Sequence, residues 1–169
     1  MTAAELMVRM GELAVSSTPG EVLASIGLGS CIGLALLDTR KGVAGLAHVM
    51  LPSKPSDADV MPGKFAGTAV PALVESMVEV GSSGLRLEAV LVGGAQMFSF
   101  GGAGAGKLDV GARNEEATRA ALAAARIPVR AAATAGAKGR TIKVSVEGPL
   151  VTVKEAGGAV EVLFGEEAR

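Results

Sequence analysis

The sequence has no tryptophan, no tyrosine and only four phenylalanines among its 169 residues. Aromatic rings on which nucleic-acid bases could stack are therefore nearly absent. Sixteen Lys and Arg residues stand against 17 Asp and Glu, for a formal net charge of −1. The chain thus lacks the basic surplus with which proteins hold nucleic acids or anionic lipid surfaces. We expect no nucleic-acid partner and no insertion into a membrane.

Cysteine and histidine are equally scarce, because the chain contains one of each, Cys31 and His48. One cysteine excludes a disulfide framework within the chain and a zinc site built from several thiolates. We therefore expect neither a metal nor a cofactor. The chemistry that stays open is one that needs a single thiol and a single imidazole.

Long uninterrupted apolar segments are also missing. Glu5, Arg9 and Glu12 break the apolar residues near the N-terminus, and the uncharged run 22–37 is short for a bilayer span. Hydrophobic residues nevertheless make up 49% of the chain, which is enough for a core. The composition predicts one domain over residues 1–169 and a cytoplasmic protein.

Residue periodicity predicts about eight strands and two helices. The helices are expected over 68–80, with Thr68 as the cap and Pro71 in the first turn, and over 114–126, with Asn114 as the cap. Most strands are separated by turn residues, which favours antiparallel pairing over alternating βαβ winding. The predicted fold class is α+β, a layered α/β sandwich with a mostly antiparallel, strand-rich core and at least two packed helices. The strands are expected within 6–15 and over 21–26, 31–37, 43–51, 88–92, 140–146, 150–155 and 159–164, with one more following Ile127.

Cys31 directly follows a glycine-rich corner, Gly27-Leu28-Gly29-Ser30, and begins a predicted strand. Backbone N–H groups of Gly29, Ser30 and Cys31 would have no ladder partner there and could stabilise an oxyanion beside the thiol. The alternative is that Cys31 is a small buried apolar residue, as most free cysteines are.

His48 lies on the strand that returns from the hairpin begun by Cys31. Neighbouring strands would let the imidazole take the proton of the thiol and pass it to a leaving group. The alternative is a buried histidine whose ring is satisfied by a backbone carbonyl.

A third pattern, Gly101 to Lys107, matches the phosphate-binding loop G-x-x-x-x-G-K, but Leu108 stands where that loop needs Ser or Thr. A surface loop is the better interpretation than a nucleotide site.

Several short motifs together resemble those of the chemoreceptor glutamine deamidases, the CheD family. Leu28-Gly29-Ser30-Cys31-Ile32 and Ala47-His48-Val49-Met50-Leu51-Pro52 look like the family's LGSC and H-x-M-L-P signatures at the family's spacing. Gly93 to Phe98, Gly111 to Asn114 and Gly139-Arg140 resemble its further motifs, in the same order. The resemblance covers nearly the whole chain.

This resemblance implies a thiol-dependent hydrolase that acts on glutamine side chains of methyl-accepting chemotaxis receptors. The family's Cys, His and hydroxyl residue map onto Cys31, His48 and Ser25, where Ser25 replaces the usual Thr and would hold the imidazole from its other side. Gly29 and Ser30 would contribute to the oxyanion site. The resemblance also implies a CheC-type phosphatase as partner. A regulatory binding module, or a glutamyl methyl ester hydrolase using the same thiol, stays open as an alternative, and the composition favours a monomer.

One departure from the family concerns the backbone near its last glycine-rich motif. Ala133 and Ala135 stand where the family usually has Asp and Gly before Gly136.

Overall fold

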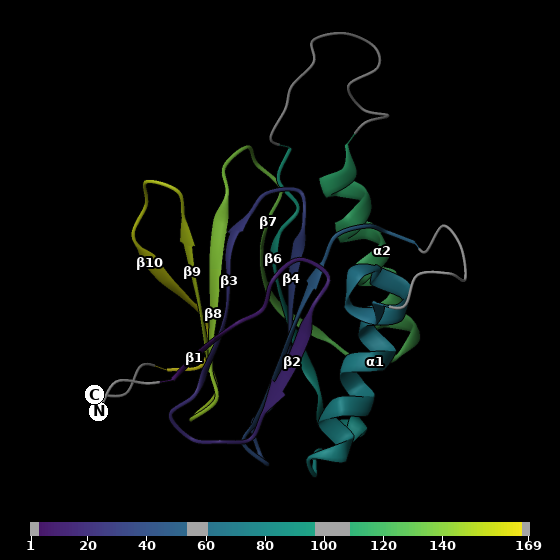
Figure 1. Ribbon diagram of the computed structural model, residues 1–169, viewed down its shortest axis with the longest axis vertical. Helices are drawn as coiled ribbons and strands as arrows, with labels where there is room; N and C mark the ends of the chain where they lie inside the picture. The colour runs from purple at the N-terminus through teal and green to yellow at the C-terminus, as the bar shows by residue number, and fades with distance from the viewer. Residues whose placement is uncertain (1–3, 54–60, 97–108, 167–169) are drawn as a thin grey trace, which may run out of the picture.

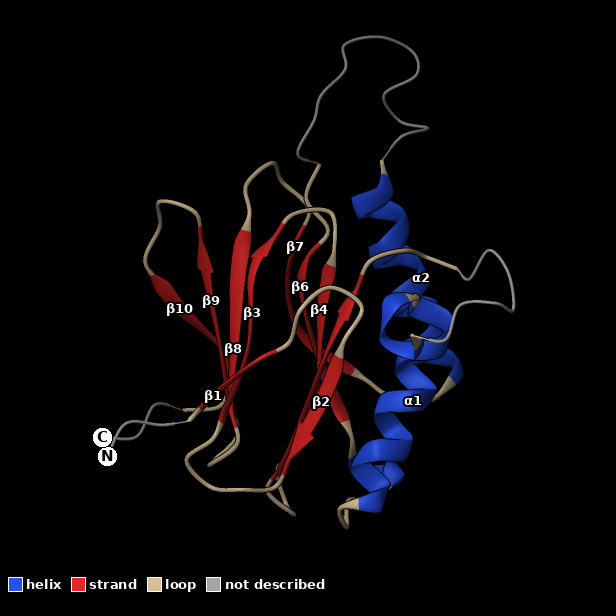
Figure 2. Cartoon of the chain, viewed as in Figure 1, coloured by secondary structure: helices blue, strands red, loops and turns tan. Residues whose placement is uncertain are grey.

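Two β-sheets and a pair of helices form three layers in the computed structural model, which describes residues 4–53, 61–96 and 109–166 (Figure 1). The sheets lie face to face, and both helices cover the outer face of the second sheet (Figure 2). In the first sheet the strand order is β1 (Glu5–Met7), β3 (Val22–Leu28), β8 (Arg140–Ser145), β9 (Leu150–Glu155) and β10 (Val160–Phe164). In the second sheet it is β2 (Leu13–Ser16), β5 (Val43–Val49), β4 (Ile32–Asp38), β6 (Glu88–Gly93) and β7 (Val129–Thr134).

The α+β class is confirmed, and six of the eight strand pairings are antiparallel. The expected absence of βαβ winding is wrong for one unit, because β6 and β7 are parallel neighbours joined through α2 (Val110–Ala124). Parallel neighbours need a crossover, and a helix of this length supplies it. The glycine-rich stretch 101–107 belongs to that connection and lies outside the described residues.

The central strands of the second sheet are buried on both faces. On β4, Ile32, Leu34 and Leu36 pack under the helices, whereas Ala35 and Leu37 face the first sheet. This alternation follows from the two-residue period of a strand. Side chains of odd number on β4 therefore point into the space between the sheets.

The first helix, α1 (Ala66–Glu79), begins two residues before the predicted start. The start of the helix is fixed by a backbone bridge between Leu51 and Phe65, in which the Ala66 N–H donates to the Leu51 carbonyl at 3.0 Å. Thr68 is therefore inside the helix rather than its cap, and its hydroxyl donates to the Pro62 carbonyl at 2.5 Å. Pro71 lies in the helix interior, where it removes the hydrogen bond to the carbonyl of the exposed Gly67. In the described ranges, no helix combines the length and apolar character needed to cross a membrane.

The second helix also begins earlier than predicted, at Val110. Asp109 is the N-cap, and its carboxylate accepts a hydrogen bond from the Ala112 N–H at 2.9 Å. The predicted cap, Asn114, lies in the second turn and is completely buried. The assignment of Asn114 as a cap was wrong because the helix extends back to pack Gly111 against residues 94 and 95.

Ala135 adopts a left-handed backbone conformation, with φ of 66°. This conformation costs an L-residue about 1 kcal/mol or more, which accounts for the usual preference for glycine at such positions. Neighbouring hydrogen bonds hold it in place: its N–H donates to the Gly93 carbonyl at 3.1 Å, and its carbonyl accepts from the Arg140 guanidinium at 2.7 Å.

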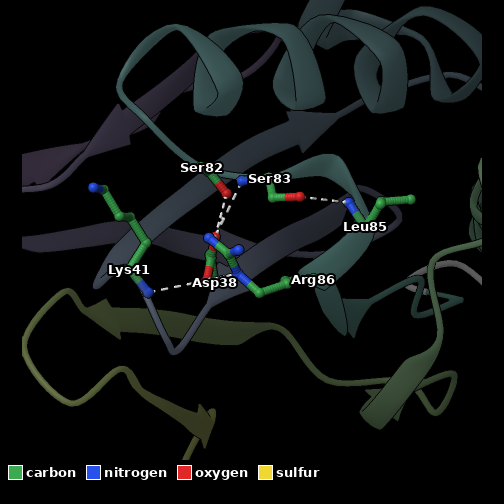
Figure 3. Close-up of polar contacts among 6 residues, drawn as sticks. All are labelled: Asp38, Lys41, Ser82, Ser83, Leu85 and Arg86. Carbon is green, nitrogen blue, oxygen red and sulfur yellow. Dashed lines mark hydrogen bonds and ion pairs between the residues drawn. The ribbon is translucent and has the colours of Figure 1, made fainter.

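A buried carboxylate joins three segments at the end of β4 that is distant from Cys31 (Figure 3). Asp38 is 0% exposed and accepts hydrogen bonds from the Ser82 hydroxyl at 2.6 Å, the Arg86 guanidinium at 3.1 Å and the Lys41 N–H at 3.0 Å. Burial by itself would raise the pKa of Asp38, but these hydrogen bonds and that of the Ser83 N–H lower it from 3.8 to about 2. The charged form is therefore the one that the fold favours.

The first prediction concerns this carboxylate. Asp38→Asn should lower the free energy of unfolding by about 3 kcal/mol at pH 7, because it removes the charge that pairs with Arg86 and disrupts a buried network. Urea unfolding measures the loss. The matched control is Glu88→Gln, which breaks the ion pair with the half-exposed Arg130 and should cost at most about 1 kcal/mol.

The pH dependence gives this prediction a second readout. Because the folded-state pKa of Asp38 is lowered, its contribution is fully present above about pH 4 and is lost as pH falls from 4 toward 2. The stability difference between wild type and Asp38→Asn should shrink over that range. A difference that stays constant down to pH 2 would contradict the account.

Candidate functional site

Cys31, His48 and Ser25 all project into the space between the two sheets. Cys31 directly precedes β4 and packs against the core between the sheets. His48 lies on β5 opposite Gly33, on the face that also carries Ala44 and Leu46. Ser25 lies on β3 of the first sheet, two residues beyond the inward-facing Leu23. The structure thus places the three predicted residues on both walls of one interior space.

Residues 29–31, which we name the thiol loop, have all three of their carbonyl groups bound from one side. The Gly29 carbonyl accepts from the Ala95 N–H at 2.8 Å, and the Cys31 carbonyl accepts from the Gly94 N–H at 2.9 Å. Between them, the Ser30 carbonyl accepts from the side-chain amide of Asn114 at 2.9 Å. Partners from the end of β6 and from α2 therefore determine the orientation of the loop.

This orientation leaves two backbone N–H groups free. In a trans peptide the N–H points away from the carbonyl of the same unit, so the Ser30 N–H faces away from Ala95 and the Cys31 N–H faces away from Asn114. Within the described part of the chain, neither N–H donates to an acceptor. Two adjacent free donors beside a thiol are the arrangement that stabilises an oxyanion.

Glycines allow this close packing of the thiol loop. Gly93 has φ of 114°, and a Cβ at this position would collide with the Cys31 carbonyl oxygen. A Cβ on Gly111 would lie 2.5 Å from the Gly94 carbonyl oxygen. The glycines of the two later motifs thus bring β6 and α2 within hydrogen-bonding distance of the loop.

His48 is 5% exposed, and among the described residues only one of its ring nitrogens has a partner. Its Nδ1 lies 3.1 Å from the Val8 carbonyl oxygen. Because a carbonyl can only accept, Nδ1 carries the proton and Nε2 carries the lone pair of the neutral ring. Nε2 is buried and has no hydrogen-bond partner within ranges 4–53, 61–96 and 109–166, so the Cys31 thiol does not donate to it in this resting arrangement.

Ser25 contacts the same carbonyl rather than the imidazole. Its hydroxyl is completely buried and donates to the Val8 carbonyl at 2.7 Å. The expectation that Ser25 holds the ring directly is therefore replaced by an indirect link, in which Ser25 and His48 share one acceptor. Sequence reasoning missed Val8, and no pattern could have revealed it, because any residue type supplies a backbone carbonyl.

Asn114 is the second residue that sequence reasoning misassigned. It shares the buried side of α2 with Gly111, Thr118 and Leu122, at spacings of three and four residues. A polar residue at these intervals among small and apolar ones is a recognisable signal of a buried amide. The helix-start pattern around Asn114 obscured that signal.

Comparison with known proteins assigns the family. The family model described as CheD chemotactic sensory transduction matches residues 50–155. A probable chemoreceptor glutamine deamidase CheD of Symbiobacterium thermophilum is 43% identical over 152 residues, which cover 89% of this chain and 92% of that protein. This chain belongs to the CheD family. The chemoreceptor glutamine deamidase CheD of Thermotoga maritima is 37% identical over 160 residues, 95% of this chain and 98% of that protein.

The similarity to the CheD family includes the thiol loop and its hairpin. A probable chemoreceptor glutamine deamidase CheD of Clostridium novyi is 36% identical over 164 residues, 96% of this chain and 100% of that protein. An alignment of that extent necessarily spans residues 25–48. A solved structure, Bacillus licheniformis hypothetical protein YfiH, covers 47% of this chain with 17% identity and a TM-score of 0.35, too low to support an argument.

Burial favours the neutral forms of the Cys31 thiol and the His48 imidazole near pH 7. Burial raises the pKa of the Cys31 thiol above its usual value. Burial also lowers the pKa of His48, although the Val8 hydrogen bond and the charge of Glu12 oppose this shift. The resting site therefore holds a thiol and a neutral imidazole rather than a thiolate–imidazolium pair. Across the described ranges, no three side chains of metal-ligand type gather.

The second prediction follows from the raised thiol pKa. The rate of Cys31 alkylation by iodoacetamide should increase steadily with pH through 9, since the raised pKa leaves the thiolate a minor species at pH 7. Mass spectrometry of the modified protein gives the rate, and glutathione treated in parallel gives the reference profile. A rate that reaches its plateau below pH 7 would show a preformed thiolate and contradict this electrostatic description.

Proposed function

We propose that this chain deamidates glutamine side chains of chemoreceptors, with Cys31 as nucleophile and His48 as general base and acid. The observation that carries the proposal is that a half-buried thiol and an unbound base project into one interior space. The ring nitrogen Nε2 of His48 has no hydrogen-bond partner among the described residues, and the Ser30 and Cys31 N–H groups beside the thiol donate to no described acceptor. A carboxamide placed there meets a nucleophile, a base and oxyanion donors together.

In the first step, the sulfur of Cys31 bonds to the carboxamide carbon while Nε2 of His48 takes the thiol proton. Because the resting thiol is neutral, proton transfer accompanies the attack, and the thiol must turn toward Nε2 as substrate binds. The carbonyl oxygen acquires the negative charge and accepts hydrogen bonds from the Ser30 and Cys31 N–H groups.

In the second step, the imidazolium of His48 returns its proton to the leaving nitrogen, the carbon–nitrogen bond breaks and ammonia departs. Water then attacks the thioester, with Nε2 again taking a proton. The carbon–sulfur bond breaks, and the products are a glutamate side chain and the restored thiol. Throughout the cycle Nδ1–H keeps its hydrogen bond to the Val8 carbonyl, which also stabilises the transient imidazolium.

Ser25 acts on this cycle through Val8. Its hydroxyl holds the carbonyl at the angle at which that carbonyl accepts from His48. Serine supplies the same donor as the family's usual threonine but lacks the methyl group that restricts χ1.

Two further activities compete with deamidation. Hydrolysis of glutamyl methyl esters needs the same groups and an easier leaving group. A regulatory binding module for a CheC-type phosphatase is favoured by one observation, the raised pKa of the thiol. The CheC-type partner, the monomeric state and the cytoplasmic location stay predictions.

The third prediction tests deamidation with a chemoreceptor cytoplasmic fragment as substrate. Wild type should release ammonia and convert receptor glutamines to glutamates, as peptide mass spectrometry detects. Cys31→Ala should abolish the reaction, and His48→Ala should lower kcat by at least about 100-fold, the usual range for a lost general base.

For wild type, kcat/KM should rise with pH through a value below 6.5 and level off near neutrality, because the pKa of His48 is lowered.

Arg130→Ala is the matched control, since Arg130 lies on β7 and pairs with Glu88 at the surface. It should keep the wild-type rate. Undiminished deamidation by Cys31→Ala would refute the proposed function, and ester hydrolysis without ammonia release would favour the esterase alternative.

A further inference from the structure

One buried side chain connects the thiol loop to the strand that carries His48. Asn114 is 0% exposed, and its amide nitrogen donates to the Ser30 carbonyl at 2.9 Å and to the Met50 carbonyl at 2.9 Å. Met50 lies two residues beyond His48, just after β5 ends. A single amide group therefore bridges the segment before β4 and the segment after β5.

The orientation of this amide is determined by its surroundings. A primary amide has two N–H hydrogens, and each of the two carbonyls takes one. The reversed amide would place Oδ1 against two carbonyl oxygens with no hydrogen between them. Oδ1 is itself buried without a partner among the described residues. The two hydrogen bonds of the amide nitrogen therefore offset the free-energy cost of burying this oxygen.

The bond to Ser30 has a consequence for chemistry. The Ser30 carbonyl and the Cys31 N–H belong to one peptide unit, and in a trans unit they point in opposite directions. Holding the carbonyl toward α2 therefore directs the Cys31 N–H away from α2. The carbonyls of Gly29 and Cys31 are held by backbone donors, whereas Ser30 depends on this one side chain.

We infer that Asn114 is a positioning residue for the deamidation, which aligns the Cys31 N–H as an oxyanion donor by holding the Ser30 carbonyl. This inference rests on the proposed function. Asn114 does not touch the substrate, and it acts only through the peptide unit between Ser30 and Cys31. Its second hydrogen bond, to the Met50 carbonyl, holds that peptide unit at a fixed position relative to His48 on β5.

The fourth prediction separates this role from general support of the fold. Deamidation forms an oxyanion, whereas alkylation of Cys31 by iodoacetamide forms a carbon–sulfur bond without one. For Asn114→Ala we expect the ratio of deamidation kcat to alkylation rate to fall about 10- to 100-fold from wild type, somewhat less than direct removal of an oxyanion donor. KM for the receptor fragment should change little, since no substrate contact is lost.

The matched control is Thr118→Val, one turn further along α2. Thr118 is equally buried, and its hydroxyl donates to the backbone carbonyl of Asn114 at 2.7 Å, inside the helix. Its replacement should lower the thermal stability while leaving the ratio within about twofold of wild type. Circular dichroism verifies that each variant is folded before its rates are compared.

Asn114→Ser provides a second variant if Asn114→Ala does not fold. Its hydroxyl keeps a polar atom in the cavity but has only one donor and a shorter side chain, so it cannot hold both carbonyls, and the same fall in the ratio is expected. An unchanged ratio in the folded variant, or equal losses in deamidation and alkylation, would overturn the inference. Absence of deamidation by wild type itself would instead contradict the proposed function.

Discussion

The hydrogen bond between the Val8 carbonyl and Nδ1 of His48 determines which ring nitrogen can act as a base. The segment that contains Val8 passes from β1 in the first sheet to β2 in the second. It is tied to both sheets, because the Val8 N–H donates to the Ala24 carbonyl at 2.7 Å and the Gly11 N–H donates to the His48 carbonyl at 3.0 Å. The Val8 carbonyl therefore reaches its position only when both sheets are assembled. Because this carbonyl holds the proton on Nδ1, the availability of Nε2 as a base also depends on the assembled fold.

The position of the thiol loop depends on close contact between backbone segments. Gly93 and Gly111 let backbone approach backbone without intervening side chains, and the buried amide of Asn114 closes the remaining gap. Motifs that lie up to 86 residues apart in the chain, at 28–32 and 111–114, thus contribute to one local arrangement. Their shared task is to hold the carbonyls of the thiol loop on one side and leave the N–H groups of Ser30 and Cys31 on the other. The Asp38 network performs a separate, structural task at the opposite end of β4.

Local patterns were sufficient to predict the hairpin that follows Cys31 and carries His48. A strand period of two and a turn around Gly42 place Cys31 and His48 on one face of neighbouring strands, and the observed register agrees. Contacts made across the fold were beyond such patterns. The parallel β6–α2–β7 unit, the burial of Asn114 and the role of Val8 all depend on which surfaces meet after folding. For the same reason, the hydroxyl of Ser25 was correctly placed near His48 but given the wrong partner.

His48 rests as a neutral ring with its proton on Nδ1 and its lone pair on Nε2, beside a protonated thiol. Nitrogen-15 NMR of protein labelled at its single histidine measures this most directly, since the two ring nitrogens have different shifts when one is protonated and the other is not. At pH 7 we expect a protonated Nδ1 and an unprotonated Nε2, both in wild type and in Cys31→Ser. A doubly protonated ring at pH 7, or a proton on Nε2 with Nδ1 bare, would contradict it.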